Sequence, residues 1–253
     1  MGLGFLRIEF VRQVKADVSQ RHVPSGHLVH ALRPAERSER VATVADRARW
    51  PDAEASTIRM GRQKDMSEWD AKTAEWYASH FGEYATNRVG LDQVAISPDA
   101  VVVDVGCGTG AALRHASARV TAGRLVGIDP IPRMIEIARE KTADHPAASR
   151  IAYRVGSAED LPVDDDSADL VLAFDSIDHW ADRALGLAQV KRILRAGGRF
   201  VVVKDGNVAG SGEARKALTD ELQQAGLAVI EHKDMSGEGV RFGLWVCEHA
   251  ASA

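Results

Sequence analysis

The sequence predicts an α/β fold with a doubly wound, Rossmann-like sheet of seven strands and helices on both faces. Short apolar segments alternate with helical segments from residue 101 to residue 226, the order that gives a mostly parallel sheet covered on both sides. Two strand-like segments, 227–232 and 241–249, then follow with only a turn-rich stretch between them. This spacing predicts an antiparallel hairpin at one edge of the sheet.

Five strands are expected before this hairpin. Each is a short run rich in Val, Ile, Leu or Phe, which is typical of strands buried on both faces. They are expected at residues 101–105, 124–129, 150–156, 169–174 and 199–204.

Helices are expected between these strands, at residues 110–118, 132–143, 184–195 and 214–225. Pro132 stands at the start of the second of them, a position that suits a residue without an amide hydrogen. We expect Gly197 and Gly198 to end the helix at 184–195, because glycine favours the conformation found at helix C-termini.

A further helix is expected before the first strand. Ser67 and Asp70 form an S-x-x-D capping signature. The aromatic residues Tyr77, Phe81 and Tyr84 then recur at helical spacing, which predicts one continuous helix with an aromatic face.

The chain divides near residue 65. Residues 1–65 carry ten Arg and two Lys against eight acidic residues, a net charge of +4. The whole chain has a net charge of −4, so residues 66–253 have a net charge of −8. The first part lacks clear periodicity and is expected to be a disordered or loosely helical extension. An interaction arm is the alternative. Residues 66–253 are expected to form the folded domain.

Composition excludes several classes of function. The acidic net charge disfavours nucleic acid and anionic membranes as partners, and no run of 18 apolar residues exists that could span a bilayer. Two cysteines, Cys107 and Cys247, exclude a disulfide framework and favour a cytoplasmic location. Their spacing from histidines predicts no metal site.

The stretch DVGCGTG, residues 104–110, lies between the first predicted strand and the following helix. Glycine permits positive φ and close approach of a ligand to the backbone, and ligands of such sheets bind beside the first strand. Asp129 ends the second strand, 21 residues after Gly108. An acid at this distance typically accepts hydrogen bonds from ribose hydroxyls. The loop is therefore predicted to bind a nucleotide-like ligand.

Four segments resemble class I S-adenosylmethionine (SAM) methyltransferases, in particular the small-molecule group that includes quinone-biosynthesis methyltransferases. In family order they are DVGCGTG, VGIDPIPRMIEIARE, GSAEDLPVDDDSADLVLAFDSIDHW and VKRILRAGGRFVVV. The resemblance covers about residues 67–250. It implies SAM as cofactor and in-line transfer of its methyl group to a small-molecule acceptor. The sequence has no large insertion after the fourth or fifth strand, so we expect no separate substrate domain.

The resemblance also implies roles for individual residues. Gly106, Gly108 and Gly110 would form the floor under the methionine part and the ribose, Asp104 would support the loop and the ammonium end, and Asp129 would hold the ribose hydroxyls. The family usually has an acid where Ser157 stands, and a neutral hydroxyl accepts more weakly. The other implied cofactor-binding residues are Pro130, Met134, Ser157, Ala158 and Glu159 near the adenine, Phe174 at the amino-acid end, and Tyr77 closing the pocket.

A general base is needed only if the acceptor must lose a proton. His179, just past the fourth strand, is the first candidate because its reference pKa is near neutrality. A surface or capping role for His179 is the alternative. Asp175 and Asp178 are further candidates for the base.

Two other functions fit the same loop. Gly106, Gly108 and Ala111 also satisfy G-x-G-x-x-A, which would allow an NAD(P)-dependent oxidoreductase. Against this, Asp104 would be repelled by a pyrophosphate, and no tyrosine is followed four residues later by lysine, as a short-chain reductase requires. A SAM-binding module without catalysis would carry the same binding residues.

Overall fold

A computed structural model describes residues 69–205 and 212–249 of the chain. The expectations for residues 1–65 and for Ser67 lie outside the described residues. No helix within the described ranges is long and apolar enough to cross a membrane.

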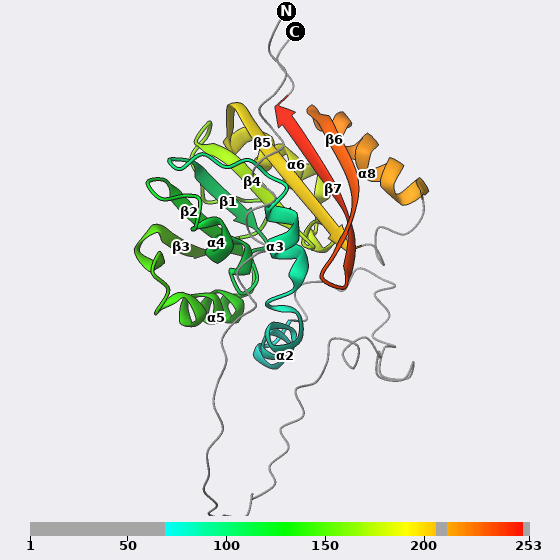
Figure 1. Ribbon diagram of the computed structural model, residues 1–253. Helices are drawn as coiled ribbons and strands as arrows, with labels where there is room; N and C mark the ends of the chain where they lie inside the picture. Colours follow the sequence, from blue (N-terminus) through cyan, green and yellow to red (C-terminus); the bar gives the residue numbers. More distant parts are fainter. Residues whose placement is uncertain (1–68, 206–211, 250–253) are drawn as a thin grey trace, which may run out of the picture. The chain divides into compact units, whose positions relative to one another are not determined.

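The described strands form one seven-stranded sheet of order β3-β2-β1-β4-β5-β7-β6 (Figure 1). The pairs from β3 to β5 are parallel, and β7 pairs antiparallel with both β5 and β6. This confirms the predicted mostly parallel sheet with an antiparallel edge. The strands are β1 (Val101–Val105), β2 (Arg124–Asp129), β3 (Ile151–Val155), β4 (Ala168–Phe174), β5 (Leu194–Asp205), β6 (Leu227–Gly237) and β7 (Val240–His249).

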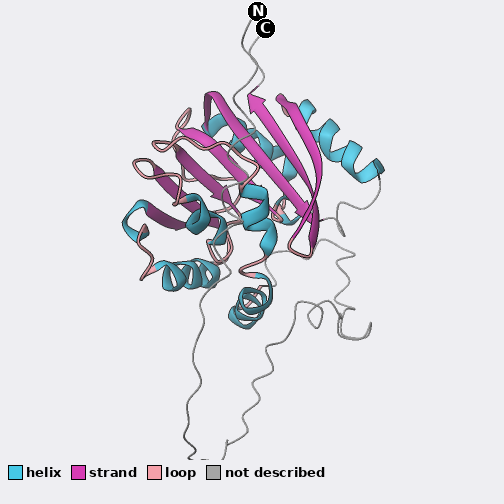
Figure 2. Cartoon of the chain, viewed as in Figure 1, coloured by secondary structure: helices cyan, strands magenta, loops and turns pink. Residues whose placement is uncertain are grey.

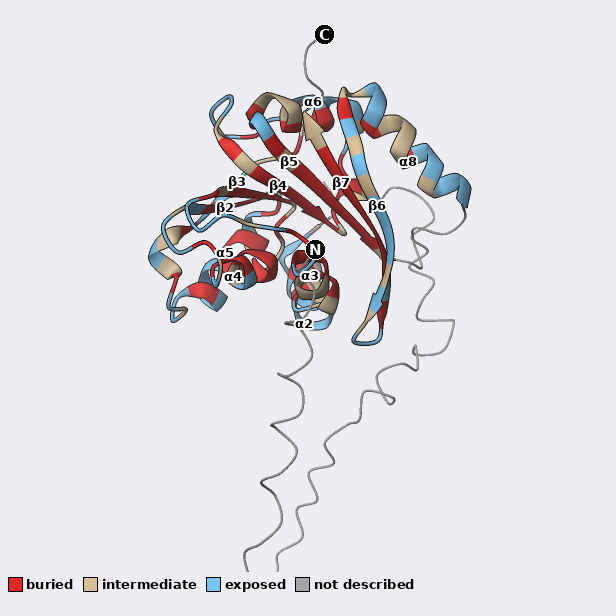
Figure 3. Cartoon of the chain, turned by 45° about the horizontal axis from the view of Figure 1, so that its top comes forward, coloured by how far each residue is buried: buried red, intermediate tan, exposed pale blue. Residues whose placement is uncertain are grey.

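Two clusters of buried hydrophobic residues form layers on the two faces of the sheet. Figure 2 shows the helices around the sheet, and Figure 3 shows that its central strands are mostly buried. Successive residues of a strand point to opposite faces, so Val102 joins one layer and Val103 the other. The first layer lies under α3 (Ala85–Leu91), α4 (Ala111–Ala116) and α5 (Pro132–Thr142), and the second lies under α6 (Arg183–Ile193) and α8 (Gly212–Gln224). The predicted arrangement of helices on both faces is therefore confirmed.

The register places the functional strand ends at one edge. β1 pairs with β2 up to Val105 and Ile128, and it pairs with β4 on its other side. Chain order therefore reverses between β1 and β4, the point at which ligands bind in such sheets. The segments that follow β1, β2, β4 and β5 all begin at this edge.

The predicted end of the helix at residues 184–195 is wrong. α6 ends at Ile193, and Gly197 and Gly198 lie inside β5. Leu194 already has extended dihedral angles and pairs with Ala168. The register then shifts, and Gly197 takes a φ of +74° within this irregularity. The glycine pair thus allows a bulge in a strand.

The single helix expected to run through Tyr84 is also wrong, because the chain forms two helices here. α2 (Ala71–Phe81) begins after Asp70, whose carboxylate accepts hydrogen bonds from the amide and the hydroxyl of Thr73 at 2.8 Å. It ends at Gly82, where a Cβ would lie 2.5 Å from a side-chain carbon of Thr109. Tyr84 instead precedes the first residue of α3.

The predicted hairpin is confirmed, with strands longer than expected. Glu238 and Gly239 form its tip with φ angles of +51° and +80°. Positive φ at both central residues is characteristic of the type I′ turn, whose twist matches that of the two antiparallel strands. β7 returns between β5 and β6, so β6 is the edge strand.

Candidate cofactor-binding and active site

The glycine loop is folded against the end of β2. The amides of Gly106 and Cys107 both donate to the carbonyl oxygen of Ile128, at 2.8 and 3.0 Å, and the Gly110 amide donates to the Cys107 carbonyl at 2.8 Å. Gly106, Gly108 and Gly110 have φ angles of +76°, +51° and +79°. Side chains are disfavoured at all three positions for this conformational reason.

The three glycines differ in what surrounds them. A Cβ on Gly106 would lie 2.4 Å from Cβ of Ser176, and one on Gly110 would lie 2.1 Å from the Tyr153 hydroxyl. A Cβ on Gly108 would meet no protein atom within 4 Å. The first and third glycines therefore permit close packing, whereas the middle one presents its backbone to open space.

Asp129 links the glycine loop to the start of the segment after β2. Its carboxylate accepts from the amide of Gly108 and from the amide of Ile131, both at 3.0 Å. Burial raises the pKa of Asp129 to about 6, while the two amides oppose that rise. The side chain is thus held in one orientation, and each oxygen keeps a lone pair for a further donor.

Asp104 is the most unusual polar group of the site. Its side chain is 2% exposed, and its Oδ1 atom has no hydrogen-bond partner among the described residues. Burial, and then the charge of Asp129, raise the pKa of Asp104 to about 7. A buried carboxyl oxygen without a partner is rare in folded proteins, and a cationic or hydrogen-bonding ligand would satisfy it.

The turn after β4 begins with a strained residue. Asp175 has a φ of +54°, and its amide donates to the Val203 carbonyl at 2.9 Å. Its carboxylate accepts from the Thr86 hydroxyl and from the Asp205 amide, both at 2.7 Å. Burial raises the pKa of Asp175 to about 6 against these hydrogen bonds. Asp175 therefore connects β4, β5 and α3.

The rest of this turn is fixed to the glycine loop. The Ser176 hydroxyl donates to the Val105 carbonyl at 2.6 Å and its Cβ lies beneath Gly106. A short 3₁₀ helix, η3 (Ile177–His179), follows. Burial lowers the pKa of His179, with a smaller opposing effect of Asp178. The His179 imidazole is therefore expected to be neutral at pH 7.

Tyr77 places α2 over the strand ends. Burial, and then the charges of Asp175 and Asp129, raise the pKa of Tyr77 to about 12. Tyr77 therefore lies close enough to Asp175 and Asp129 for both charges to act on its phenol. Its ring also makes an edge contact with Trp69, with centroids 5.2 Å apart. Phe174, 7% exposed at the end of β4, packs on the α3 side of the sheet.

The residues implied for the adenine lie in varied environments. Pro130 and Ser157 are half-buried, and Met134 is 2% exposed in a cluster with α2. Ala158 is buried in the second core layer. The Glu159 carboxylate accepts from the Asp182 amide at 3.0 Å, at the start of α6. Among these residues, Glu159 already has a structural partner.

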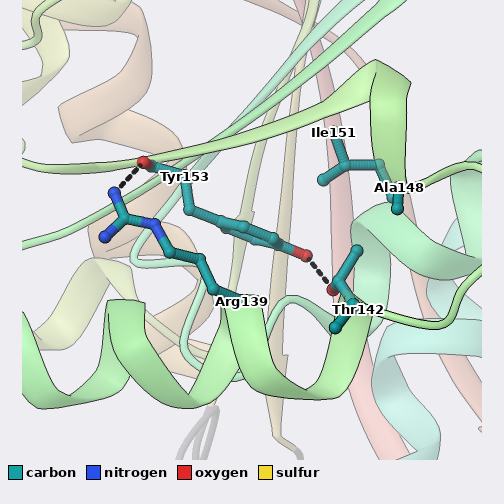
Figure 4. Close-up of a pocket in the computed structure, with 6 residues that line it drawn as sticks. Arg139, Thr142, Ala148, Ile151 and Tyr153 are labelled. Atoms are coloured by element: carbon teal, nitrogen blue, oxygen red, sulfur yellow. Dashed lines mark hydrogen bonds between the residues drawn. The ribbon is translucent and has the colours of Figure 1, made fainter.

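Sequence reasoning missed the residues that support the loop from behind. The Tyr153 hydroxyl lies 2.9 Å from Thr142 Oγ1, and the Arg139 guanidinium donates to the Tyr153 carbonyl at 2.8 Å (Figure 4). These residues line a cavity of about 170 Å³ between α5 and β3. Arg114 extends the support by donating to the Thr109 carbonyl at 2.6 Å. An inward-facing tyrosine in a strand gives no local signal of this role.

Lys204 was missed for the same reason. It follows three valines of β5 and is 8% exposed, and its Nζ lies 2.9 Å from the Asp178 carboxylate. Within residues 69–205 and 212–249, no three His, Cys, Asp or Glu side chains are grouped so that they could hold a metal ion.

Comparison with known proteins agrees with this geometry. Residues 103–202 match the model of a methyltransferase domain. A ubiquinone/menaquinone biosynthesis C-methyltransferase from Geobacter sp. is 35% identical over 118 residues, which cover 46% of this chain and 50% of that protein. The chain therefore contains a methyltransferase domain and resembles SAM-dependent methyltransferases.

Other proteins similar to this chain differ in the reaction named for them. An O-methyltransferase from Penicillium expansum is 29% identical over 150 residues, covering 59% of this chain and 54% of that protein. The structure of a SAM-dependent methyltransferase from Aquifex aeolicus has a TM-score of 0.59 at 17% identity and covers 72% of this chain and all of that one. The chain spans about half the length of the curated methyltransferases it matches.

Proposed function

We propose that this chain transfers the methyl group of SAM to a small-molecule acceptor. The observation that carries the proposal is Asp104, whose buried Oδ1 lacks a partner beside a glycine loop with open space at Gly108. The ammonium and sulfonium of SAM would compensate buried carboxylates at this position. The pyrophosphate of a dinucleotide would instead add negative charge next to Asp104 and Asp129.

Different residues of the site would bind different parts of the cofactor. The backbone of Gly106, Gly108 and Gly110 would support the methionine part and the ribose, and Asp104 would face the ammonium group. Asp129 would accept from the two ribose hydroxyls with the lone pairs left by the Gly108 and Ile131 amides. Around these groups, the proposal assigns Pro130, Met134, Ser157, Ala158 and Glu159 to the adenine side, and Tyr77 and Phe174 to the methionine side.

When bound, SAM supplies a methyl carbon that an acceptor lone pair attacks as the carbon–sulfur bond breaks and its electron pair goes to sulfur. The protein then has to orient the acceptor and exclude water. We assign both tasks to Tyr77 on α2, and the effect of the Asp175 and Asp129 charges on its phenol supports this assignment.

His179 is the better candidate for the base, if the acceptor carries a proton. Both oxygens of Asp175 already accept hydrogen bonds, from Thr86 and Asp205. In contrast, burial favours the neutral form of His179, which is the form that accepts a proton. We therefore propose that His179 accepts the proton of the acceptor and that Asp175 has a structural role.

The acceptor is proposed to be a small molecule rather than nucleic acid or a membrane lipid surface. The net charge of −4 supports this, since nucleic acid and anionic lipid favour basic surfaces. Similar proteins are named for ubiquinone and menaquinone biosynthesis, and a structural neighbour from Streptomyces coelicolor binds geranyl diphosphate. A cytoplasmic location is part of the proposal, supported by Cys107 and Cys247 being free thiols.

Calorimetric titration of the full chain with SAM, S-adenosylhomocysteine and NAD(H) tests the proposal. We expect binding of the two sulfur ligands at micromolar concentrations and no heat with NAD(H). Binding of NAD(H) without SAM would overturn it and favour an oxidoreductase. Binding of SAM without turnover of any phenol, amine or carbon acid in a radiolabelled-methyl screen would favour a SAM-binding module.

A further inference from the structure

Lys204 is a buried lysine whose charge is matched, among the described residues, by one close carboxylate. Its Nζ lies 2.9 Å from the carboxylate of Asp178, and its side chain is 9% exposed. Burying an unpaired ammonium is costly, so the Asp178 carboxylate compensates the buried charge at the end of β5. Arg183 at the start of α6 is a more distant partner of Asp178, at 3.8 Å.

The pair adds a side-chain contact to the middle of the turn after β4. Residues 175 and 176 are held by Thr86, Asp205 and Val105, as described above. Asp178 is the next side chain of this turn with a polar partner, and that partner is Lys204. His179 follows directly, and its amide donates to the Ser176 carbonyl at 2.9 Å.

Asp178 is also the carboxylate whose charge acts on His179. The two side chains are adjacent in the chain, and among the nearby charges only Asp178 acts on the pKa of His179. A carboxylate hydrogen-bonded to an imidazole favours the protonated form. A base that must be neutral before reaction is weakened by such a pairing at neutral pH.

We propose that Lys204 is a positioning residue for the proposed base: by binding Asp178, it holds the turn of residues 175–180 in place and keeps the Asp178 carboxylate from pairing with His179. This inference rests on the proposed function for its catalytic meaning, but the arrangement of the three side chains can be measured without any substrate. The other ionisable groups around the turn are Asp175, Asp205, Glu159, Asp182, Arg183 and Glu221.

The test is an NMR titration of the His179 ring in the full chain, with its signal assigned by loss in His179→Gln. Lys204→Met keeps the length and apolar stem of the side chain but removes the charge. We expect the His179 pKa to rise by about half a unit or more, because the freed carboxylate turns to the imidazole. Lys204→Arg should restore the wild-type value. Arg215→Met, which breaks the exposed pair with Asp234, is the matched control and should change nothing.

A double-mutant cycle separates positioning from charge alone. If Lys204 acts by holding Asp178, then Lys204→Met should shift the His179 pKa less in an Asp178→Asn background than in the wild type. Equal shifts in both backgrounds, or no shift in either, would overturn the positioning role.

The proposed function is tested separately in the same proteins. Lys204→Met should bind SAM as tightly as the wild type, because the pair lies outside the residues assigned to the cofactor. If the wild type itself fails to bind SAM, the proposed function fails while the titration still decides the arrangement of Lys204, Asp178 and His179. Once an acceptor is known, Lys204→Met should lower kcat at pH 7 and move the acidic limb of kcat/KM upward.

Discussion

The amide of Gly108 donates a hydrogen bond to the carboxylate of Asp129 across 3.0 Å. The central glycine of the loop and the acid at the end of β2 are thus parts of one structure. The carboxylate that we propose to bind ribose also fixes the backbone on which the ligand would rest. Cofactor contacts and loop shape are therefore expected to change together when Asp129 is replaced.

Asp129→Ala should weaken SAM binding by about 100-fold or more, because hydrogen bonds to a charged group contribute about 1.5–3 kcal/mol each. Isothermal calorimetry measures the loss, and circular dichroism checks that the fold is retained. Asp144→Ala, at an exposed acid of the same domain, is the control and should bind normally. Normal binding by Asp129→Ala would remove Asp129 from the cofactor site.

Alanine at Gly108 and at Gly110 should have opposite consequences. Gly110→Ala places a methyl group against the Tyr153 hydroxyl at positive φ, which should lower the free energy of unfolding by about 2–4 kcal/mol. Gly108→Ala meets no protein atom and should cost only about 1 kcal/mol of stability. We expect Gly108→Ala to lose SAM binding at least about tenfold, since the methyl group would occupy the ligand side of the loop. Chemical denaturation and calorimetry on both variants decide, and unchanged SAM affinity in Gly108→Ala would place the ligand elsewhere.

Because of its buried carboxyl groups, the ligand-free protein is expected to be more stable at acidic pH than at neutral pH. The pKa of Asp104 is about 7 in the fold, above its unfolded value of about 3.9. Between these values the folded protein holds the extra proton, so the free energy of unfolding falls as pH rises through that window. Asp129 and Asp175, with pKa values of about 6, act in the same direction.

Bound SAM should reverse this trend, because its positive charges favour ionised Asp104. The increase in Tm on adding SAM is therefore expected to grow from pH 5 to pH 8, and Asp104→Asn should flatten that dependence. Thermal denaturation with and without SAM at each pH measures both. A SAM-induced increase that is constant across this range would show that Asp104 does not face the cofactor.

His179→Gln and Asp175→Asn distinguish the two candidate bases. His179→Gln should leave SAM affinity unchanged and lower turnover by about 100-fold or more. Asp175→Asn keeps a residue that tolerates positive φ but loses one of two accepted hydrogen bonds, so it should lower stability by about 1–2 kcal/mol. Initial rates corrected for the folded fraction separate the two. Full activity in His179→Gln, with loss in Asp175→Asn, would assign the base to Asp175.

The strands could be predicted from the sequence because their signal is local. The runs VVVDV and RLVGID are buried on both faces, and their apolar character alone sets the bounds of β1 and β2. The prediction that Gly197 ends a helix was wrong because glycine suits both a helix end and a strand irregularity, and only the pairing of Leu194 with Ala168 decides between them. The prediction of one helix through Tyr84 was wrong because Gly82 lies against Thr109, 27 residues away in the sequence.

The candidate site was predictable where its residues follow strand ends and hidden where they act across the sheet. Asp104, Asp129 and Asp175 each stand at or just after the end of an apolar run. Lys204 and Tyr153 take their roles from Asp178 and Gly110, distant in sequence and close in space. No local pattern encodes such a pairing, because it depends on the strand order.

The place of β7 in the sheet has a consequence for how the chain matures during translation. Residues 240–249 enter between β5 and β6 and bury Trp245 completely. Domains generally fold as units while the chain emerges from its N-terminal side. Until His249 leaves the ribosome, β5 keeps an open edge and Lys204 lacks its register partner Gly243. The nascent chain therefore passes through a stage at which every segment proposed to bind the cofactor has been synthesised but the sheet is incomplete. At this stage chaperones or other strands have access to the open edge of β5.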